Sequence, residues 1–410
     1  MRVARGAWWV SVCWLGASLG ACSDAGGPDC QPLQARPFEE RADPTFLRGP
    51  WLFHATSDRL VFGFDTAEAC QGTVELGRPG EALAPAGEEA ASRLEHQLEV
   101  AGLAPDTRYA YRLRCGALES QEHTAYTAPA PGAAVRFAVL GDTQSHPEVS
   151  ARVVREVLPF EPAFLLHVGD AVGGGAEQSA WDEQFYPPLE ALQDHAPVYA
   201  ALGSHEQDGY GYHRRSPGEL LSPESPEDSC YAFSAGNLFV LVMSTEGLFF
   251  PVTEEVGTPI SEWIERVVAS PEARAATWRV AIGHQPARVE GWTPGNCEPP
   301  TTFSGNPFVA GWLLPLLAEH GFQAYFSGHT HAYERGEVAG VHTFVTGGGG
   351  GDLDELCREL PEIAVFRSVH HHLRVTAGCD QLTVEAWALD EAAPFDRVDI
   401  PASTGAGEGG

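Results

Sequence analysis

Two histidines stand one residue apart in the segment SGHTHAYER, residues 327–335, directly after the apolar run FQAYF. Gly328 lacks a Cβ, so the backbone can turn sharply at that point. Side chains two positions apart in an extended segment point to the same side, so His329 and His331 can face one site. Paired imidazoles suit a metal site, although a glycine turn with two surface histidines explains this segment equally well when it is taken alone.

Four other apolar runs also end in a glycine that is followed by a side chain able to bind a metal. Aspartates follow two of these runs, Asp142 in VLGDTQ and Asp170 in HVGDAV, and histidines follow the other two, His205 in ALGSHE and His284 in AIGHQP. The intervals between the runs are irregular, which argues against a repeat array. We therefore expect one edge of a sheet to present all of these side chains together.

Two carboxylates and three imidazoles on neighbouring loops suit a pair of divalent or trivalent metal ions, with one carboxylate bridging them. Two such ions about 3.5–4 Å apart lower the pKa of a bound water and hold both oxygens of an in-line displacement at phosphorus. The set therefore predicts hydrolysis of phosphate esters, with metal-bound hydroxide as the nucleophile. The alternative is a degenerate, non-catalytic surface lipoprotein that uses the same fold for binding, but a binding module needs no such set of ligands.

The part of the chain that carries these blocks, residues 133–400, alternates strand and helix patterns. The runs 135–140 and 163–168 are typical of buried strands, and helical spacing of apolar residues follows in 145–158 and 260–268. Ser145 and Glu148 fit a capping box at the start of the first helix. This alternation predicts an α/β domain of sheet layers covered by helices, with the site at the carboxyl ends of strands.

A different pattern precedes that domain. Residues 45–128 contain short alternating segments separated by Gly, Pro and Asp, which is typical of a β-sandwich. The segment from Leu103 to Tyr109 resembles the tyrosine corner of fibronectin type III domains. We find no catalytic cluster there and interpret the domain as a packing module. The segment TAPAPG, residues 127–132, is the expected linker, and residues 401–410 are expected to be a disordered tail.

The amino terminus has the features of an export signal. Residues 1–21 carry two arginines, a short apolar stretch and small residues, and they lead to Cys22 in a sequence that resembles the lipobox of bacterial lipoproteins. That resemblance implies cleavage before Cys22, a lipid anchor to the membrane, and a location at the cell envelope, periplasmic or outer surface. An ordinary secretory peptide cleaved nearby is the alternative. Residues 22–44 are polar and rich in Gly and Pro, so we expect a tether.

Charge and cysteine content narrow the class of protein further. The formal net charge is −31 over 410 residues, which argues against binding to nucleic acid or to an anionic membrane surface. Apart from Cys13 and Cys22, seven cysteines remain without zinc-finger spacing, so we expect disulfides and one odd thiol. Cys70 and Cys115 are predicted to pair within the first domain.

In order and spacing, the five blocks resemble the calcineurin-like metallophosphoesterases. GHTHAYER and the preceding fibronectin III-like domain are similar to the purple acid phosphatase branch, and the resemblance covers roughly residues 45–400. It implies a layered β-sheet sandwich flanked by helices, an acid-phosphatase-like hydrolase, a phosphorylated small-molecule substrate, and two metal ions drawn from Fe, Zn or Mn.

The resemblance also implies a role for each block. Asp142 and His331 would hold the first metal, Asp170 would bridge, and the second metal would lie on His284 and His329. His205 would lie outside the metal shell, where it binds a phosphate oxygen or protonates the leaving group.

Three positions depart from the family pattern. Gly173 stands where purple acid phosphatases have the tyrosine of GDxxY, and Ser204 replaces the asparagine ligand of GNH with a shorter hydroxyl. The loop after the fourth block, QPARVEGWTPGNCEPP, lacks the substrate-facing histidines of that branch. Gln144 stands where many metallophosphoesterases have a histidine, and it is a further possible ligand of the first metal. We expect the glycines of TGGGGG, residues 346–351, to pack near the site, and His370 to His372 to be structural.

Overall fold

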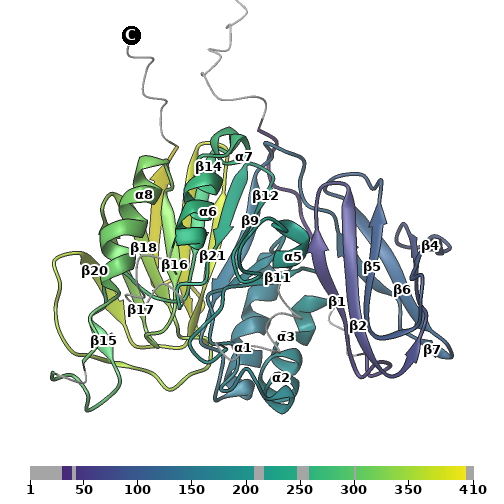
Figure 1. The fold of residues 1–410 in the computed structure, drawn as a ribbon, viewed down its shortest axis with the longest axis horizontal. Helices are drawn as coiled ribbons and strands as arrows, with labels where there is room; N and C mark the ends of the chain where they lie inside the picture. Colours follow the sequence, from purple (N-terminus) through teal and green to yellow (C-terminus); the bar gives the residue numbers. More distant parts are fainter. Residues whose placement is uncertain (1–29, 39–42, 207–216, 247–257, 300–301, 403–410) are drawn as a thin grey trace, which may run out of the picture.

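The computed structural model describes residues 30–38, 43–206, 217–246, 258–299 and 302–402. The predicted signal peptide, Cys22 and most of the predicted tail lie outside the described residues. Two β-rich parts lie side by side, a smaller one that is purple to blue and a larger one that is teal to yellow (Figure 1). Among the helices of the described residues, none is long and apolar enough to cross a lipid bilayer.

The smaller part is a β-sandwich. One sheet has the order β1 (Arg48–Ala55), β2 (Arg59–Cys70), β5 (Arg93–Ala101), and the other the order β4 (Ala84–Glu88), β3 (Gly72–Gly77), β6 (Arg108–Cys115), β7 (Leu118–Glu119), with β8 (His123–Tyr126) also on β6. Alternate residues of β2 and β6, such as Phe62 and Tyr111, meet in one apolar core. The Tyr109 hydroxyl accepts a hydrogen bond from the Ala104 N–H at 2.9 Å, which is the geometry of a tyrosine corner.

The larger part contains two sheets packed face to face. The first has the strand order β11 (Val198–Ala200), β10 (Leu165–His167), β9 (Val135–Leu140), β21 (His371–Ala377), β22 (Gln381–Ala388), β23 (Asp396–Pro401). The second has the order β12 (Tyr231–Ala235), β13 (Leu238–Val242), β14 (Trp278–Ile282), β16 (Ala324–Ser327), β18 (Val341–Thr346), β17 (Tyr333–Val338), β20 (Ile363–Arg367). The pair β15 (Gly291–Trp292) and β19 (Glu355–Leu356) lies apart from both.

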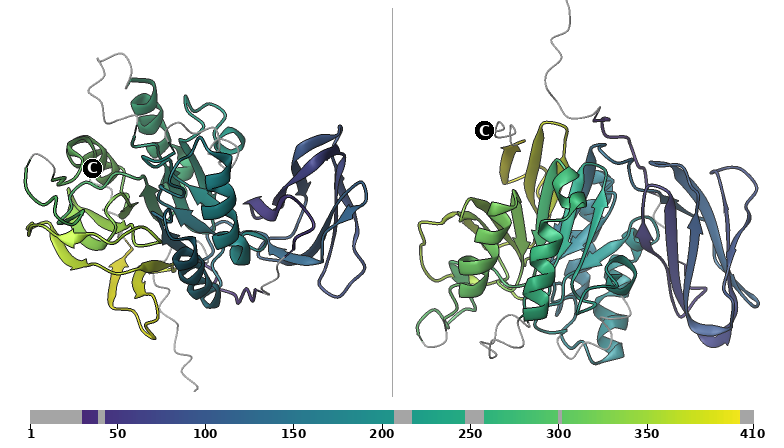
Figure 2. Two further views of the ribbon diagram at one scale, coloured as in Figure 1. Left: turned by 90° about the horizontal axis from the view of Figure 1, so that it is seen from below. Right: turned by 45° about the horizontal axis from the view of Figure 1, so that its top comes forward.

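Helices cover the outer face of each sheet. Phe137 and Val139 of β9 enter the core between the sheets, whereas Ala138 and Leu140 face the helices on the outside. The first sheet is covered by α1 (Pro147–Val157), η1 (Leu158–Phe160), α2 (Gln178–Gln184) and α3 (Tyr186–Gln193). The second is covered by α6 (Thr258–Val268), α7 (Pro271–Ala275), η2 (Val309–Leu313) and α8 (Leu314–Glu319), with α5 (Gly218–Leu221) near β12 (Figure 2). This confirms the predicted layered sandwich flanked by helices.

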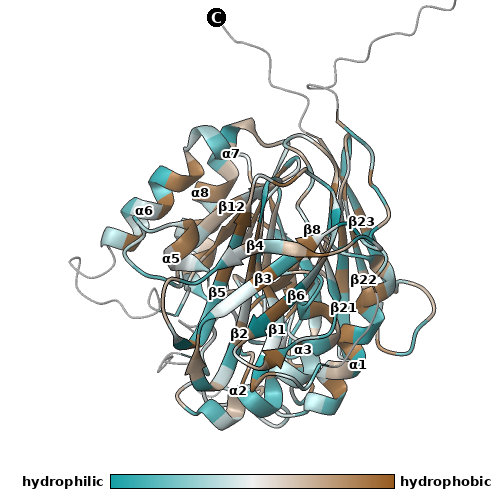
Figure 3. Ribbon diagram, turned by 90° about the vertical axis from the view of Figure 1, so that its right-hand side faces the viewer, coloured by the Kyte–Doolittle hydropathy of each residue, from teal (hydrophilic) through white to brown (hydrophobic). Residues whose placement is uncertain are grey.

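The hydropathy of the chain follows these layers. In Figure 3 the exposed helices α1 and α6 show both hydrophilic and hydrophobic residues, as expected for helices that rest one face on a sheet. Val153, Val154 and Val157 of α1 are buried, which agrees with the predicted helical spacing. The predicted capping box is wrong, because His146 is the N-cap residue of α1 and no side chain caps the helix.

The expectation that one sheet edge presents all five blocks is also wrong. Strands β9, β10 and β11 are parallel neighbours in the first sheet, whereas β14 and β16 are parallel neighbours in the second. The blocks still meet, because the two sheets pack face to face and the carboxyl ends of these strands lie at the same end of the sandwich. The site is therefore shared between two sheets.

Residues 30–38 do not behave as the tether predicted for 22–44. Cys30 forms a disulfide with Cys379, and the buried Arg36 donates a hydrogen bond to the Thr127 carbonyl at 3.0 Å and pairs with Asp106. The Phe38 ring stacks on His195 at 5.1 Å between centroids. A cation and an aromatic ring in a polar stretch therefore fix this segment against both parts of the molecule.

Cysteine pairing follows the sequence expectation. The disulfides are Cys30–Cys379, Cys70–Cys115 and Cys297–Cys357, and Cys230 is a buried free thiol. The pairing of Cys70 with Cys115 is as predicted. Three disulfides are typical of proteins that fold in an oxidising compartment.

A buried ionic contact joins the two β-rich parts. The His123 ring, from β8, lies 2.9 Å from Asp43 Oδ2 through Nε2 and 2.8 Å from Asp194 Oδ2 through Nδ1. The Tyr111 hydroxyl donates to the Asp194 carbonyl at 2.9 Å. Burial disfavours a charged ring, but the hydrogen bonds to Asp194 and Asp43 outweigh it and raise the pKa of His123. His123 therefore links the two parts through two carboxylates that favour its protonated form.

We predict that His123→Gln lowers the free energy of unfolding by about 3–5 kcal/mol at pH 6, because it leaves two buried carboxylates without a counter-charge. The folded pKa is raised above the unfolded value of about 6.5, so this stabilisation is complete below that pH and is lost as the pH rises through the folded pKa. Urea unfolding at pH 6 and pH 9 measures the difference in the free energy of unfolding between the wild type and His123→Gln, with His320→Gln as the control. We expect this difference to be smaller at pH 9. A difference independent of pH would contradict the ionic contact.

Candidate metal centre

The two aspartates sit at sharp turns where their strands end. Asp142 and Asp170 have positive φ angles of 55° and 52°, a conformation in which aspartate is tolerated better than most residues. The Asp142 N–H donates to the Gly169 carbonyl at 3.0 Å, so the two turns are joined through the backbone. Both carboxylates are almost fully buried at the end of the sandwich.

Asp170, His284 and His329 form one half of the site. The His284 Nε2 atom lies 3.1 Å from Asp170 Oδ2 and 3.2 Å from His329 Nδ1, and one ligand atom from each residue lies within 4.8 Å of the others. The His284 Nδ1 atom contacts the Val168 carbonyl at 3.0 Å and must donate to it, so Nε2 offers a lone pair to the site in the neutral ring. Three acceptor atoms at this spacing fit a bound cation.

Asp142, His331 and Gln144 form the other half. In the part of the chain that the structure describes, Asp142 Oδ2 and Gln144 Oε1 are buried without a hydrogen-bond partner. The His331 Nε2 atom lies 3.6 Å from Asp142 Oδ1 and 3.3 Å from Gln144 Nε2, while its Nδ1 donates to the Asp352 carbonyl at 2.7 Å. Buried oxygens without a donor are costly, so these residues also fit a cation.

The third block, Ser204-His205, lies beside Asp170. The Ser204 hydroxyl donates to Asp170 Oδ2 at 3.1 Å, and the His205 N–H donates to Asp170 Oδ1 at 2.9 Å. The His205 ring is 47% exposed, with Nε2 3.8 Å from Asp170 Oδ2 and Nδ1 3.0 Å from the Gly173 carbonyl. His205 is therefore at the rim, where a substrate can reach it.

Glu206 is a site residue that sequence reasoning missed. Its buried carboxylate accepts hydrogen bonds from the N–H groups of Asp170 at 2.9 Å, Gly203 at 2.9 Å and Val172 at 3.1 Å. Burial and the nearby charge of Asp170 raise the pKa of Glu206 to about 8, against the effect of these donors. A glutamate directly after the third block was the available signal. Its contacts fix the loop of Asp170 to that of Ser204.

The site distributes charge unevenly. Burial raises the pKa of Asp142 well above its usual range, and it lowers the pKa of His329 to about 3. Burial also opposes ionisation of Asp170, but His284 and its hydrogen bond hold the pKa of Asp170 below its usual range. Neutral His329 is in the state that binds a metal, and ionised Asp142 needs a nearby positive charge.

The glycine-rich loop packs on the site through its backbone, as expected. The Gly349 N–H donates to the Gly141 carbonyl at 2.9 Å, and the Gly351 N–H donates to the Asp142 carbonyl at 2.8 Å. A Cβ on Gly351 would lie 2.5 Å from His331 Cε1, so a larger residue there would displace that ring. Of the three consecutive histidines, His371 and His372 are fully buried in β21, which agrees with a structural role.

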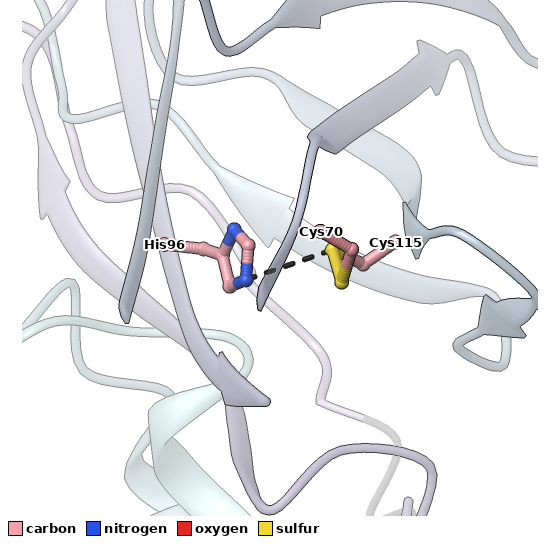
Figure 4. A group of neighbouring side chains, drawn as sticks. All are labelled: Cys70, His96 and Cys115. Atoms are coloured by element: carbon pink, nitrogen blue, oxygen red, sulfur yellow. Dashed lines mark hydrogen bonds between the residues drawn. A yellow bond between two sulfur atoms is a disulfide. The ribbon is translucent and has the colours of Figure 1, made fainter. Parts of the chain in front are cut away.

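A second group has the composition of a metal site but not the chemistry. Cys70, His96 and Cys115 lie together in the smaller sandwich, where His96 Nε2 is 3.6 Å from Cys115 Sγ (Figure 4). Both sulfurs are in the Cys70–Cys115 disulfide, so neither is a thiolate. His96 is instead held by Glu89, at 2.7 Å from Nδ1.

Comparison with known proteins identifies the larger part. The model of the calcineurin-like phosphoesterase family matches residues 135–333. That domain belongs to the calcineurin-like phosphoesterases. The match starts at β9 and ends after the GHTH block, so the calcineurin-like phosphoesterase domain contains all five blocks. This confirms the family predicted from their order and spacing.

Individual relatives point to the purple acid phosphatase branch. The Arabidopsis thaliana protein named "Probable inactive purple acid phosphatase 27" is 26% identical over 233 residues, which are 50% of this chain and 37% of that protein. This chain therefore spans little more than a third of that relative's length.

Two solved structures show how far the likeness of fold extends. Purple acid phosphatase PPD1 from yellow lupin (Lupinus luteus) seeds matches with a TM-score of 0.69 and 19% identity, over 86% of this chain and 74% of that one. PhoD matches with a TM-score of 0.62 and 15% identity, over 87% of this chain and 90% of that one. The shared fold thus extends beyond the calcineurin-like phosphoesterase domain.

We predict that Gly328→Ala in the calcineurin-like phosphoesterase domain removes at least half of the bound metal, because a Cβ there would lie 2.1 Å from Asp142 Oδ2. Metal analysis after reconstitution, together with the thermal midpoint, measures this. Gly174→Ala is the matched control, since among the described atoms none lies within 4 Å of a Cβ at that position. Full metal content in Gly328→Ala would show that metal binding does not depend on the observed position of the Asp142 carboxylate.

Proposed function

We propose that the protein hydrolyses phosphate esters at a dinuclear metal centre. One observation carries this proposal. The two groups of possible ligands, one containing Asp142 and the other Asp170, lie next to each other, and the turns of these two aspartates are joined by a backbone hydrogen bond. Each half presents carboxylate and imidazole atoms of the kind that divalent and trivalent metals bind. The family to which the domain belongs supports the same chemistry.

In this proposal Asp142, His331 and the Gln144 carbonyl hold the first metal. Asp170 would serve both ions, and His284 and His329 would hold the second metal with Ser204 as a weak ligand. When bound, the ions polarise phosphoryl oxygens and acidify water. We expect iron, zinc or manganese, and the absence of a tyrosine at Gly173 removes the residue to which the purple colour of this branch is attributed.

The remaining residues of the chain position these ligands and move a proton. Water adds its oxygen to phosphorus, the ester P–O bond breaks, and a proton must reach the departing oxygen. His205 is suited to deliver it, because the Gly173 carbonyl occupies its Nδ1–H and leaves Nε2 pointing to the site. Glu206 holds the Asp170 and Ser204 loops together while this occurs.

A non-catalytic binding protein is the second candidate, and the word "inactive" in the name of the Arabidopsis relative favours testing it. The exposed position of His205 is the feature that favours catalysis, because a binding protein has no need of an acid at the rim. Turnover of phosphate monoesters or diesters by the metal-loaded protein separates the two candidates.

We also propose that the protein is exported and lipid-anchored at Cys22. The lipobox-like sequence before Cys22 supports this, and three disulfides agree with export. Mass spectrometry of the mature amino terminus tests it, and an unmodified terminus at another residue would defeat it.

We predict that the reconstituted protein binds about two metals per chain and that Asp170→Asn loses both, together with hydrolysis, because a bridging ligand serves both ions. Metal analysis and assays on phosphate mono- and diesters measure this. Asp380→Asn, an exposed substitution at the opposite end of the first sheet, should keep both metals and full activity. One metal with undiminished hydrolysis in Asp170→Asn would contradict the bridging role.

We predict that Ser204→Asn tightens the second metal by about 10- to 100-fold, because an amide oxygen is a better and longer neutral ligand than a hydroxyl. The substitution also gives up the hydrogen bond from Ser204 to Asp170. Metal titrations of the wild type and the variant, followed by metal content and by activity, show whether the gain of an amide ligand outweighs the loss of this hydrogen bond. An unchanged or weaker second affinity would show that the hydroxyl is needed where it is.

A further inference from the structure

Two aromatic rings stand beside the proposed metal ligand His329. The centroid of the Phe303 ring lies 5.0 Å from that of His329, and the Trp292 ring lies 5.6 Å from His329 and 5.1 Å from Phe303. Trp292 lies in the loop after the fourth block, in which the expected substrate-facing histidines are missing, and Phe303 follows shortly after the end of that loop. Both are half-buried, so each keeps part of its surface open to solvent.

The segment that carries these rings is braced from several sides. The disulfide Cys297–Cys357 and the pairing of β15 with β19 tie it to residues 355–357. The buried Glu334 carboxylate accepts hydrogen bonds from the Glu290 N–H at 2.7 Å and the Gly291 N–H at 2.9 Å. The Arg358 guanidinium donates to the Phe303 carbonyl. The rings are therefore held in place before any ligand arrives.

Phe303 and Trp292 could both serve to hold the His329 ring in place, but one aromatic contact is enough for that purpose. Phe303 meets His329 edge-on, at 79°, and is sufficient to limit rotation of the imidazole. Trp carries the largest side chain type, and Trp292 is only half-buried beside a polar site, so part of the free energy available from burying such a residue is not realised. A planar ligand beside the metals would cover that surface.

We propose, on the basis of the proposed phosphoesterase function, that Trp292 and Phe303 form an aromatic wall that selects phosphate esters with an aromatic alcohol part. A phosphoryl group bound near His329 places its ester oxygen, and the ring attached to it, within a few ångströms of the wall. Offset or edge-to-face contact of aromatic rings is favourable. The loop then differs from the family pattern because the substrate differs. Aromatic rings contact the substrate where the family has substrate-facing histidines.

The first experiment compares kcat/KM for phenyl phosphate and for glycerol phosphate in the wild type, Trp292→Ala and Trp292→Phe. For each substrate, the kcat/KM of the variant is divided by the kcat/KM of the wild type. This ratio cancels the different reactivity of the two leaving groups. We expect Trp292→Ala to lose about tenfold on phenyl phosphate, mainly in KM, and less than about twofold on glycerol phosphate. Trp292→Phe should recover most of the loss. Equal losses on both substrates would overturn the aromatic wall and leave the proposed function standing.

The second experiment needs no turnover and no variant. Calorimetry of the metal-loaded wild type with phenylphosphonate and with methylphosphonate measures the contribution of the ring directly. We expect phenylphosphonate to bind at least about tenfold more tightly. If this preference is found in a protein that hydrolyses nothing, the wall holds and the proposed function fails. Equal affinities, or no binding of either phosphonate, overturn the wall.

Discussion

The buried carboxylate of Glu206 is the contact on which the geometry of the centre depends. It accepts three backbone N–H groups from the loops after β10 and β11, including that of Asp170. These donors favour the charged form of Glu206, but burial and the charge of Asp170 outweigh them and raise its pKa to about 8. Because the Asp170 turn is joined through the backbone to that of Asp142, an error in the Asp170 loop would disturb both carboxylates. The face-to-face packing of the sheets brings the other strand ends to the same place, and Glu206 sets the final position.

The sequence was sufficient to predict which side chains meet at the candidate site, but not the contacts that support them. Asp142, Asp170, His284 and His329 could be found because each follows a glycine at the end of an apolar run, and His331 because it stands two positions after His329. The division of the strands between two sheets could not be found, because apolar runs do not show which strands are neighbours. Arg36 shows another limit: a cation in a Pro-rich stretch suggests a solvated tether, and only the tertiary structure supplies Asp106 and the Thr127 carbonyl as partners. The capping box failed because His146-Pro147 already defines the start of the helix.

The departures from the family pattern fall around the centre and not in its core. Ser204 and Gly173 lie on the side of His205, where the hydroxyl contacts Asp170 and the carbonyl contacts the imidazole. Trp292 and Phe303 lie on the side of His329. The carboxylates and imidazoles proposed as metal ligands lie between these two sides. The departures therefore lie around the five blocks that the domain shares with the calcineurin-like phosphoesterases, and not within their carboxylates and ring nitrogens.

The disulfide between Cys30 and Cys379 bears on how the molecule would be oriented if Cys22 carries the proposed lipid. Cys379 lies in the turn between β21 and β22, and since β21 runs antiparallel to β9, this turn is at the end of the sandwich opposite Asp142. A lipid on Cys22 would be eight residues from Cys30, a span of at most about 30 Å when extended. The bilayer would then lie near the end of the domain opposite Asp142. The candidate metal centre would face away from the membrane, toward solutes that diffuse in the surrounding medium.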